Sequence, residues 1–88
     1  MQSFTQRLFN THGFHPDFFF NKIYTVAGVR YHVSVMDKSR HSYFFIMENT
    51  NGSWKIIDAP KVPDWIMNLE QELEHAILEH IIEEPPKE

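Results

Sequence analysis

Two histidines near the amino terminus are the first residues whose types and spacing bear on chemistry. His12 and His15 form an H-x-x-H pair, and Asp17 is the nearest carboxylate. Two imidazoles at this spacing can share a metal ion, but zinc normally needs a third and a fourth ligand. The neighbouring sequence offers too few further donors, so we interpret the pair as part of a polar loop and expect no metal site.

A second spacing, Glu72-x-x-His75, is the one used by the ligand pair of di-iron helical bundles. Such a site needs the motif twice, together with two more glutamates from other helices, and the sequence has no second copy. We therefore predict that Glu72, His75 and Glu79 belong to a solvated acidic helix face. His80 falls within the apolar arc of the same helix, where we expect it at the margin of the core.

The most site-like group combines a cation, an imidazole and aromatic rings. Arg30 and His32 alternate along one predicted strand, and the same sheet face is predicted to carry five large side chains: Tyr43, Phe45, Met47, Trp54 and Ile56. Since an arginine is attracted to an aromatic face, this group is suited to an anionic aromatic or acyl ligand. Alternatively, Arg30 and His32 lay their apolar parts along a protein contact while their tips reach water.

Several sequence features speak against catalysis. Ser34 lies about 6–7 Å from His32 along the strand, which is too far for the imidazole to activate it as a nucleophile. The chain has no cysteine and only three glycines, which are not clustered. It contains no glycine-rich phosphate loop, no nucleophile elbow and no HExxH motif. We therefore expect a protein that is not an enzyme and that uses no cofactor.

The distribution of charge bears on the class of partner. Residues 63–88 carry eight acidic residues and one lysine, whereas residues 1–62 carry seven basic and four acidic residues. An acidic helix repels phosphates, so we expect no nucleic acid partner. The amino terminus lacks the layout of a signal peptide, and no apolar run approaches the roughly 18 residues of a membrane span. We expect a cytoplasmic protein without membrane contact.

Four strands are predicted from hydrophobic alternation and turn residues. Residues 18–37 alternate about Ala27-Gly28, which fits a two-residue hairpin loop. The polar residues 37–40 are the next predicted turn, and a strand follows from about His41 to Glu48. Asn51-Gly52 is the strongest turn signal in the chain, and it precedes a fourth short strand over residues 53–58.

Helices are predicted at both ends of the chain. Residues 3–11 fit a short helix that begins with a capping box of Ser3 and Gln6. A long amphipathic helix is predicted from Pro63 to Ile82. Its apolar stripe, suited to lie on a sheet, consists of Trp65, Ile66, Leu69, Leu73, Ala76 and Ile77. The predicted fold is an α+β domain over residues 1–84, a four-stranded antiparallel meander with a C-terminal helix on one face, followed by a flexible tail, residues 85–88.

With residues 37–40 as the turn, both faces of this sheet are rich in apolar side chains. Face one is expected under the helix and holds Phe20, Tyr24, Val26, Val29, Tyr31, Val33, Val35, Phe44, Ile46 and Ile57. Face two holds Phe19, Ile23, Met36, Tyr43, Phe45, Met47, Trp54 and Ile56, with Arg30, His32 and Ser34 among them. Four bare side chains of this kind forgo burial worth on the order of 10 kcal/mol. A further layer is therefore expected on face two.

Three covers for face two remain open at this point. The first is the N-terminal segment with its apolar residues, the second is another copy of the chain, and the third is a different protein or an apolar ligand. We accordingly predict a non-catalytic interaction module that forms a homodimer, or binds another protein, through face two or through a sheet edge. The alternative is a small-molecule binding protein that uses the same residues of face two.

Overall fold

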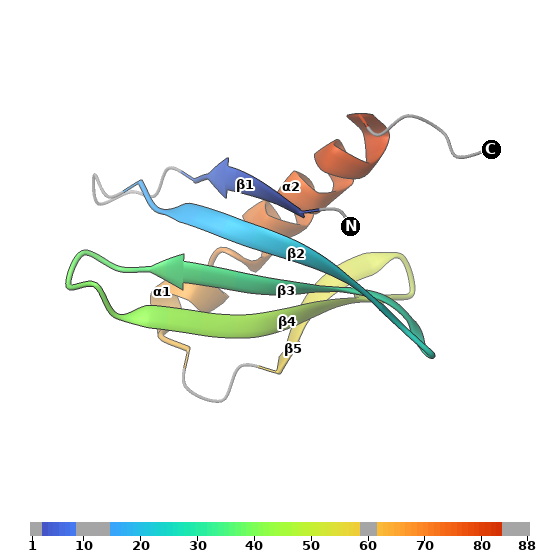
Figure 1. The fold of residues 1–88 in the computed structure, drawn as a ribbon, viewed down its shortest axis with the longest axis horizontal. Helices are drawn as coiled ribbons and strands as arrows, with labels where there is room; N and C mark the ends of the chain where they lie inside the picture. Colours follow the sequence, from blue (N-terminus) through green and yellow to red (C-terminus); the bar gives the residue numbers. More distant parts are fainter. Residues whose placement is uncertain (1–2, 9–14, 59–61, 84–88) are drawn as a thin grey trace.

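The computed structural model describes residues 3–8, 15–58 and 62–83, and it shows a five-stranded antiparallel sheet with two helices on one face (Figure 1). The strands lie in chain order: β1 (Ser3–Arg7), β2 (Asp17–Thr25), β3 (Gly28–Met36), β4 (Ser42–Thr50) and β5 (Ser53–Asp58). The helices are α1 (Asp64–Met67) and α2 (Glu70–Glu83). The predicted α+β class with an antiparallel sheet is confirmed, but the predicted strand number is one too low. Within the described residues, no helix is long and apolar enough to cross a membrane.

The N-terminal segment is a strand where a helix was predicted. Ser3–Arg7 pairs antiparallel with β2, so that Phe4 lies opposite Phe20. The two rings stack with centroids 4.5 Å apart. This contact buries part of Phe4 on the sheet, and such packing against a cross-strand neighbour outweighs the weak capping signal. The part of the predicted helix after Leu8 lies outside the described residues.

The β2–β3 hairpin has its loop one residue earlier than predicted. Thr25 pairs with Gly28, so the two loop residues are Val26 and Ala27, and Gly28 begins β3 with a φ of +131°. Moving a two-residue loop by one position shifts the pairing by two residues. Phe20 therefore lies opposite Val33 rather than Val35. Because side chains alternate with a period of two, every residue of β2 and β3 keeps its predicted face.

The β3–β4 loop contains five residues rather than four, and this difference has a larger effect. Met36 pairs with Ser42, and Val33 lies opposite Phe45. Arg40 adopts a left-handed backbone conformation with a φ of +69°. An additional loop residue changes the pairing by one, which moves all side chains of the following strand to the opposite face.

As a result, the predicted faces of β4 and β5 are exchanged. Phe44 and Ile46 lie on the helix-free face, where the sequence placed them under the helix. Ile57, also predicted under the helix, lies at an irregularity of the β4–β5 pairing and is exposed. Conversely, the side chains predicted for face two lie on the helix side: Tyr43, Phe45, Met47, Trp54 and Ile56. The turn at Asn51-Gly52 is confirmed, with φ values of 55° and 89°. Strands β4 and β5 therefore changed face together.

Asp37 holds the β3–β4 loop in place. Its Oδ1 accepts hydrogen bonds from the backbone N–H groups of Ser39 (2.8 Å) and His41 (2.9 Å), and its Oδ2 accepts one from the Tyr43 hydroxyl (3.2 Å). These bonds, first of all the one from His41, hold the pKa of Asp37 below its ordinary value. Burial and the neighbouring carboxylate raise the pKa of Tyr43. The carboxylate thus stabilises the five-residue loop in its ionised form.

We expect this loop to lose stability in acid. Because the pKa of Asp37 is lower in the folded than in the unfolded chain, its contribution is complete above pH values of about 4 and is lost as the pH falls through the folded-state pKa. Thermal unfolding of the wild type and of Asp37→Asn should therefore differ most near neutral pH. The difference should shrink towards pH 2, and a constant difference would contradict the assignment.

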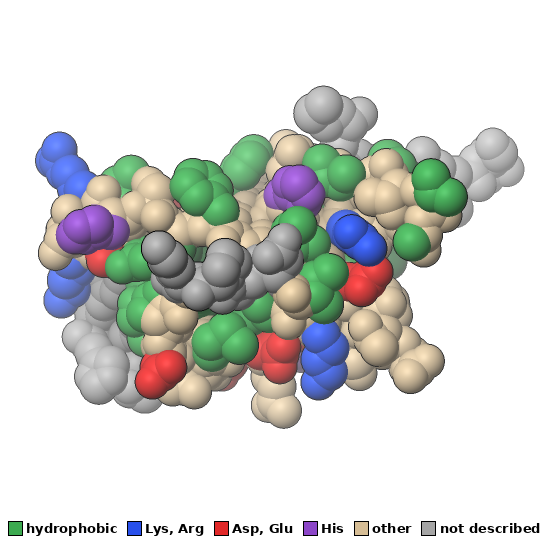
Figure 2. All heavy atoms as spheres, turned by 90° about the horizontal axis from the view of Figure 1, so that it is seen from below, with side chains coloured by type: hydrophobic (Ala, Val, Ile, Leu, Met, Phe, Trp, Pro, Cys, Tyr) green, Lys and Arg blue, Asp and Glu red, His purple; other side chains and the backbone are tan. Residues whose placement is uncertain are grey.

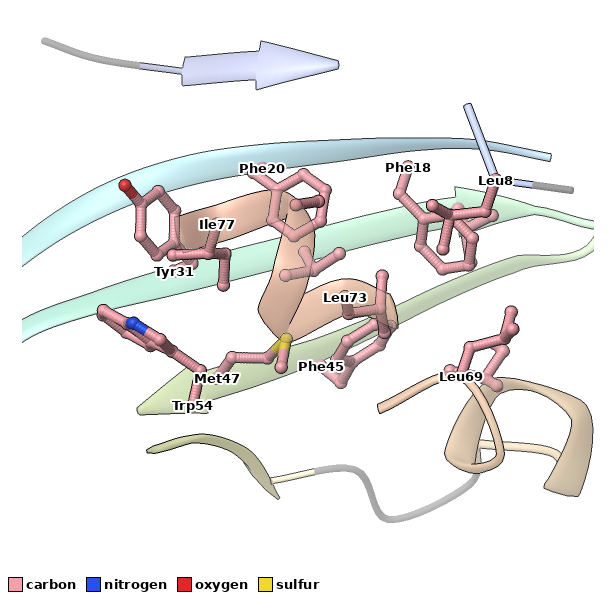
Figure 3. Packing of buried hydrophobic residues seen from close by; sticks show 14 residues of the cluster. Leu8, Phe18, Phe20, Tyr31, Phe45, Met47, Trp54, Leu69, Leu73 and Ile77 are labelled. Atoms are coloured by element: carbon pink, nitrogen blue, oxygen red, sulfur yellow. The ribbon is translucent and has the colours of Figure 1, made fainter. Parts of the chain in front are cut away.

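The core lies between the helices and the covered face of the sheet (Figure 3). The predicted helical stripe is buried at Ile66, Leu69, Leu73, Ala76 and Ile77. The partners from the sheet are Phe18, Phe20, Tyr31, Val33, Val35, Phe45, Met47 and Trp54. The single predicted helix is divided, because α1 ends at Met67 and α2 begins at Glu70. Helix α2 extends from β5, which Glu70 and Glu74 contact, to the side of β1 (Figure 1).

Candidate functional site

The helix-free face of the sheet, called the open face below, carries large apolar side chains that no described part of the chain covers. The exposed fraction is 69% for Phe44, 51% for Met36 and 44% for Phe19. The open face consists of Ser3, Thr5, Arg7, Asp17, Phe19, Asn21, Ile23, Arg30, His32, Ser34, Met36, Ser42, Phe44, Ile46, Glu48 and Lys55. Figure 2 views the molecule from below its position in Figure 1 and shows hydrophobic side chains at the surface among polar ones.

A shallow hollow of about 430 Å3 lies at the centre of this face. Its position follows from the register, because Phe19 of β2 lies opposite Ser34 of β3, which in turn lies opposite Phe44 of β4. A small serine between two phenylalanines leaves a depression. The next row across the sheet, Asn21, His32 and Ile46, closes one end of the depression.

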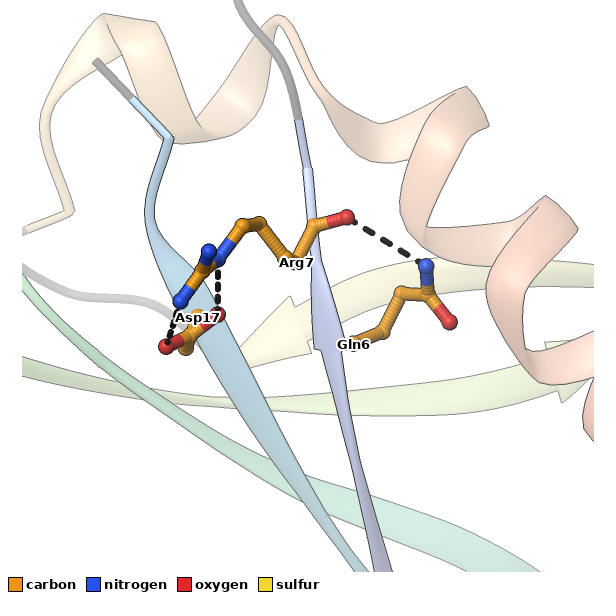
Figure 4. A network of polar contacts seen from close by, with 3 residues as sticks. All are labelled: Gln6, Arg7 and Asp17. Carbon is orange, nitrogen blue, oxygen red and sulfur yellow. Dashed lines mark hydrogen bonds and ion pairs between the residues drawn. The ribbon is translucent and has the colours of Figure 1, made fainter.

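Two ion pairs flank the hollow along the strands. Arg7 donates to Asp17 through Nε (2.8 Å) and Nη2 (3.2 Å), as Figure 4 shows. The hydrogen bond from Arg7 lowers the pKa of Asp17, and the same contact raises the pKa of Arg7. At the other end, Nη2 of Arg30 lies 3.1 Å from Oε2 of Glu48. Each pair neutralises itself, so the apolar centre is bordered by balanced charges.

The structure separates the residues that the sequence assigned to one site. Arg30 and His32 lie on the open face as predicted, and His32 borders the hollow. The five large side chains predicted beside them lie on the helix side instead: Tyr43, Phe45, Met47, Trp54 and Ile56. Their places on the open face are taken by Phe44 and Ile46, beside Phe19, which the sequence already placed on this face. Phe44 and Ile46 alternate with Tyr43, Phe45 and Met47 along β4, so only the length of the preceding loop decides which set lies on the open face.

The lining of the hollow is suited to binding rather than to a reaction. His32, Ser34 and Asn21 supply an imidazole, a hydroxyl and an amide among apolar walls. The lining residues include no carboxylate that would orient the imidazole as a general base. Such a surface can bury apolar groups and fix a few hydrogen bonds.

The remaining histidines lie elsewhere. His75 and Glu79 are exposed on α2 and lie 3.1 Å apart, consistent with a solvated acidic face. His80 is half-buried and stacks on Phe4 with ring centroids 4.0 Å apart, so its predicted position at the core margin is confirmed. His15 is exposed, and His12 lies outside the described residues. In the described part of the chain, no three histidine, aspartate or glutamate residues are grouped to hold a metal ion.

Comparison with known proteins provides no further assignment of the site. No protein-family model matches the chain, and neither a curated protein nor a solved structure matches it.

Proposed function

We propose that this protein is a non-catalytic interaction module and that its open face binds the open face of a second copy. The observation that carries the proposal is the exposure of Phe19, Met36 and Phe44 around a hollow on the one face that no helix covers. Exposed apolar patches bordered by polar groups are typical of interaction surfaces. The proposed surface retains Arg30 and His32 from the site predicted from sequence, but not its five large side chains, which lie on the helix side.

The size of the open face supports a dimer. Strands β2, β3 and β4 have nine residues each and are about 30 Å long, and β1 and β5 have five and six residues and are about 17–20 Å long. At a spacing of about 4.8 Å the face has an area on the order of 600 Å2. Stable protein–protein interfaces bury about 800 Å2 on each partner. A contact that covered the whole open face would therefore approach the standard size.

The distribution of charge favours a second copy as the occupant. The chain has a net charge of −4, and eight of its twelve acidic residues fall in residues 63–88, which include both helices. The open face carries its charges largely as the pairs Arg7–Asp17 and Arg30–Glu48. When two open faces meet, the helices lie on the outer sides of the two stacked sheets. The approach then avoids repulsion between the acidic helices.

The shape of the face is self-complementary. Phe44 projects beside the hollow above Ser34, and a two-fold axis near this row places Phe44 of each copy in the hollow of its partner. Burying a phenylalanine contributes about 1.5–3 kcal/mol, and a two-fold symmetric dimer contains this contact twice.

Sedimentation across a wide concentration range tests this proposal. We expect the wild type to change from monomer to dimer, and Phe44→Asp to raise the dimer dissociation constant at least about 100-fold, since two buried rings contribute about 3 kcal/mol or more. Val26→Asp is the matched control, because Val26 is an exposed apolar residue in the β2–β3 loop and receives the same charge. Ser34→Phe should also prevent association by filling the hollow. A wild type that stays monomeric at millimolar concentration would exclude the dimer.

A second candidate function is the binding of a small aromatic or anionic ligand in the hollow. It is favoured by the volume of about 430 Å3, which falls within the range of ligand sites, and by the imidazole of His32 at its border. Benzoate is a suitable probe, followed by NMR at His32 and Asn21. Saturable shifts in a monomer, lost in His32→Ala but not in His75→Ala, would support this function over the dimer.

A further inference from the structure

The two edges of the sheet differ in how their backbone groups are used. At the β5 edge, the N–H groups of Trp54 and Ile56 donate to the carboxylates of Glu74 (3.0 Å) and Glu70 (2.9 Å) from α2. These bonds occupy donors that would otherwise be offered to another strand. The β5 edge is therefore closed to strand addition along these residues.

The β1 edge has the opposite character. The N–H of Leu8 donates to the carbonyl of Pro16 (3.0 Å), which places Leu8, Gln6 and Phe4 with their backbone groups towards β2. In an antiparallel pair the alternate residues, here Thr5 and Arg7, direct theirs outward. Among the described residues, the outward N–H of Thr5 has no hydrogen-bond partner, and the carbonyl of Arg7 accepts only a 3.3 Å bond from the Gln6 side chain (Figure 4).

A groove runs along this open edge, between β1 and α2. It consists of two adjoining hollows of about 290 and 240 Å3, both lined by Gln6, Ala76 and Glu79. Arg7, Leu8, Glu72 and His75 add to the first hollow, and Phe4, Thr5 and His80 add to the second; the guanidinium of Arg7 is paired with Asp17. A strand placed beside β1 would direct every second side chain into this groove, one into each hollow, because residues two apart are about 6.6 Å apart.

The charge of the groove indicates which side chains it accepts. Glu72 and Glu79 are both exposed, lie two helical turns apart and line the hollows. Lysine or arginine side chains can lay their aliphatic stems over Ala76 and Phe4 and bring their charges to these carboxylates. A second copy is a poorer occupant of this edge, because pairing two β1 strands would bring two acidic α2 helices together.

We propose that the β1 edge binds an extended basic peptide segment as a sixth strand, whose alternate Lys or Arg side chains enter the groove against α2. Backbone hydrogen bonds to Thr5 and Arg7 supply register, and the two carboxylates select the charge, as in other cases of strand addition. The groove lies on the helix side of β1, whereas the hollow of the open face is lined from β2, β3 and β4, so the two sites use different side chains.

The proposal is tested with a short fluorescent peptide of alternating lysine and threonine, titrated into the full chain at low salt. Thr5→Pro removes the outward N–H at an edge position that tolerates proline, and Thr5→Ala is its control, because it keeps the N–H. We expect the dissociation constant for Thr5→Pro to be at least about tenfold above that for Thr5→Ala. Equal affinities would exclude strand addition. If Thr5→Pro does not fold, a peptide N-methylated at alternate amides replaces it and should lose binding to the wild type.

Charge selection is tested separately. The double variant Glu72→Gln/Glu79→Gln should weaken the lysine peptide at least about tenfold, and a peptide with glutamate in place of lysine should not bind the wild type measurably. Unchanged binding by the double variant would overturn the assignment of the groove. Sedimentation of Glu72→Gln/Glu79→Gln should match that of the wild type, because both residues lie on α2 and not on the open face, so failure of the peptide site and failure of the dimer are seen independently.

Discussion

Replacing Phe45 by alanine is expected to lower the free energy of unfolding by about 3–4 kcal/mol, whereas the same change at the neighbouring Phe44 should cost less than about 1 kcal/mol. Phe45 is 2% exposed and packs under the helices, while Phe44 is 69% exposed on the open face. Two adjacent residues of one type thus differ only in the face to which they point. Urea denaturation of monomeric protein, followed by circular dichroism, measures both values.

This pair of variants decides the register of β4. A four-residue β3–β4 loop would place Phe44 in the core and Phe45 outside, so the order of the two effects would be reversed. Because a small domain has a total stability of only about 5–10 kcal/mol, Phe45→Ala is close to the limit of folding. Phe45→Leu and Phe44→Leu provide a milder pair, for which the same order is expected.

The loop that decides this register could not be predicted from its residue types. Residues 37–41 combine a left-handed Arg40, which is uncommon for a residue other than glycine, asparagine or aspartate, with a carboxylate of Asp37 that accepts three hydrogen bonds. The turn at Asn51-Gly52 was predictable because both residues readily adopt a positive φ. The sequence therefore determined the β4–β5 hairpin and left the β3–β4 pairing undetermined.

The residues of β4 do not indicate which of its two faces is buried, because both faces are apolar. Tyr43, Phe45 and Met47 alternate with Phe44 and Ile46. Burial of either set satisfies the hydrophobic pattern, so periodicity reveals a strand but not its orientation. For the same reason the prediction of an apolar surface opposite the helix does not depend on the register, although the residues that form it do.

The N-terminal strand could not be predicted from the sequence for a different reason. Ser3–Arg7 is short, and its pairing with β2 depends on a contact that is distant in sequence, Phe4 on Phe20. The apolar stripe of the helix was predictable, because five of its six residues recur at helical spacing and are buried. The contacts of Glu70 and Glu74 with β5 depend on where this helix lies across the sheet, so they could not be predicted from the sequence.

Removing the carboxylates of both Glu70 and Glu74 is the second change that we expect to lower the stability strongly. Glu70→Ala/Glu74→Ala leaves the N–H groups of Trp54 and Ile56 without partners in a partly buried position. Hydrogen bonds to charged groups contribute about 1.5–3 kcal/mol each, so the double variant should lose about 3–6 kcal/mol. It should also aggregate at concentrations where the wild type does not, because the freed β5 edge can pair with another chain.

Two controls separate edge protection from helix electrostatics. Glu72→Ala/Glu79→Ala removes the same charge from α2 without touching β5, and we expect a change of less than about 1 kcal/mol. Glu70→Gln/Glu74→Gln keeps an oxygen that can accept each bond, so it should retain more than half of the stability that the alanine variant loses. If the glutamine variant were as unstable as the alanine variant, the negative charge at the start of α2 would be the stabilising factor. The β5 edge would then be protected by repulsion rather than by occupied donors.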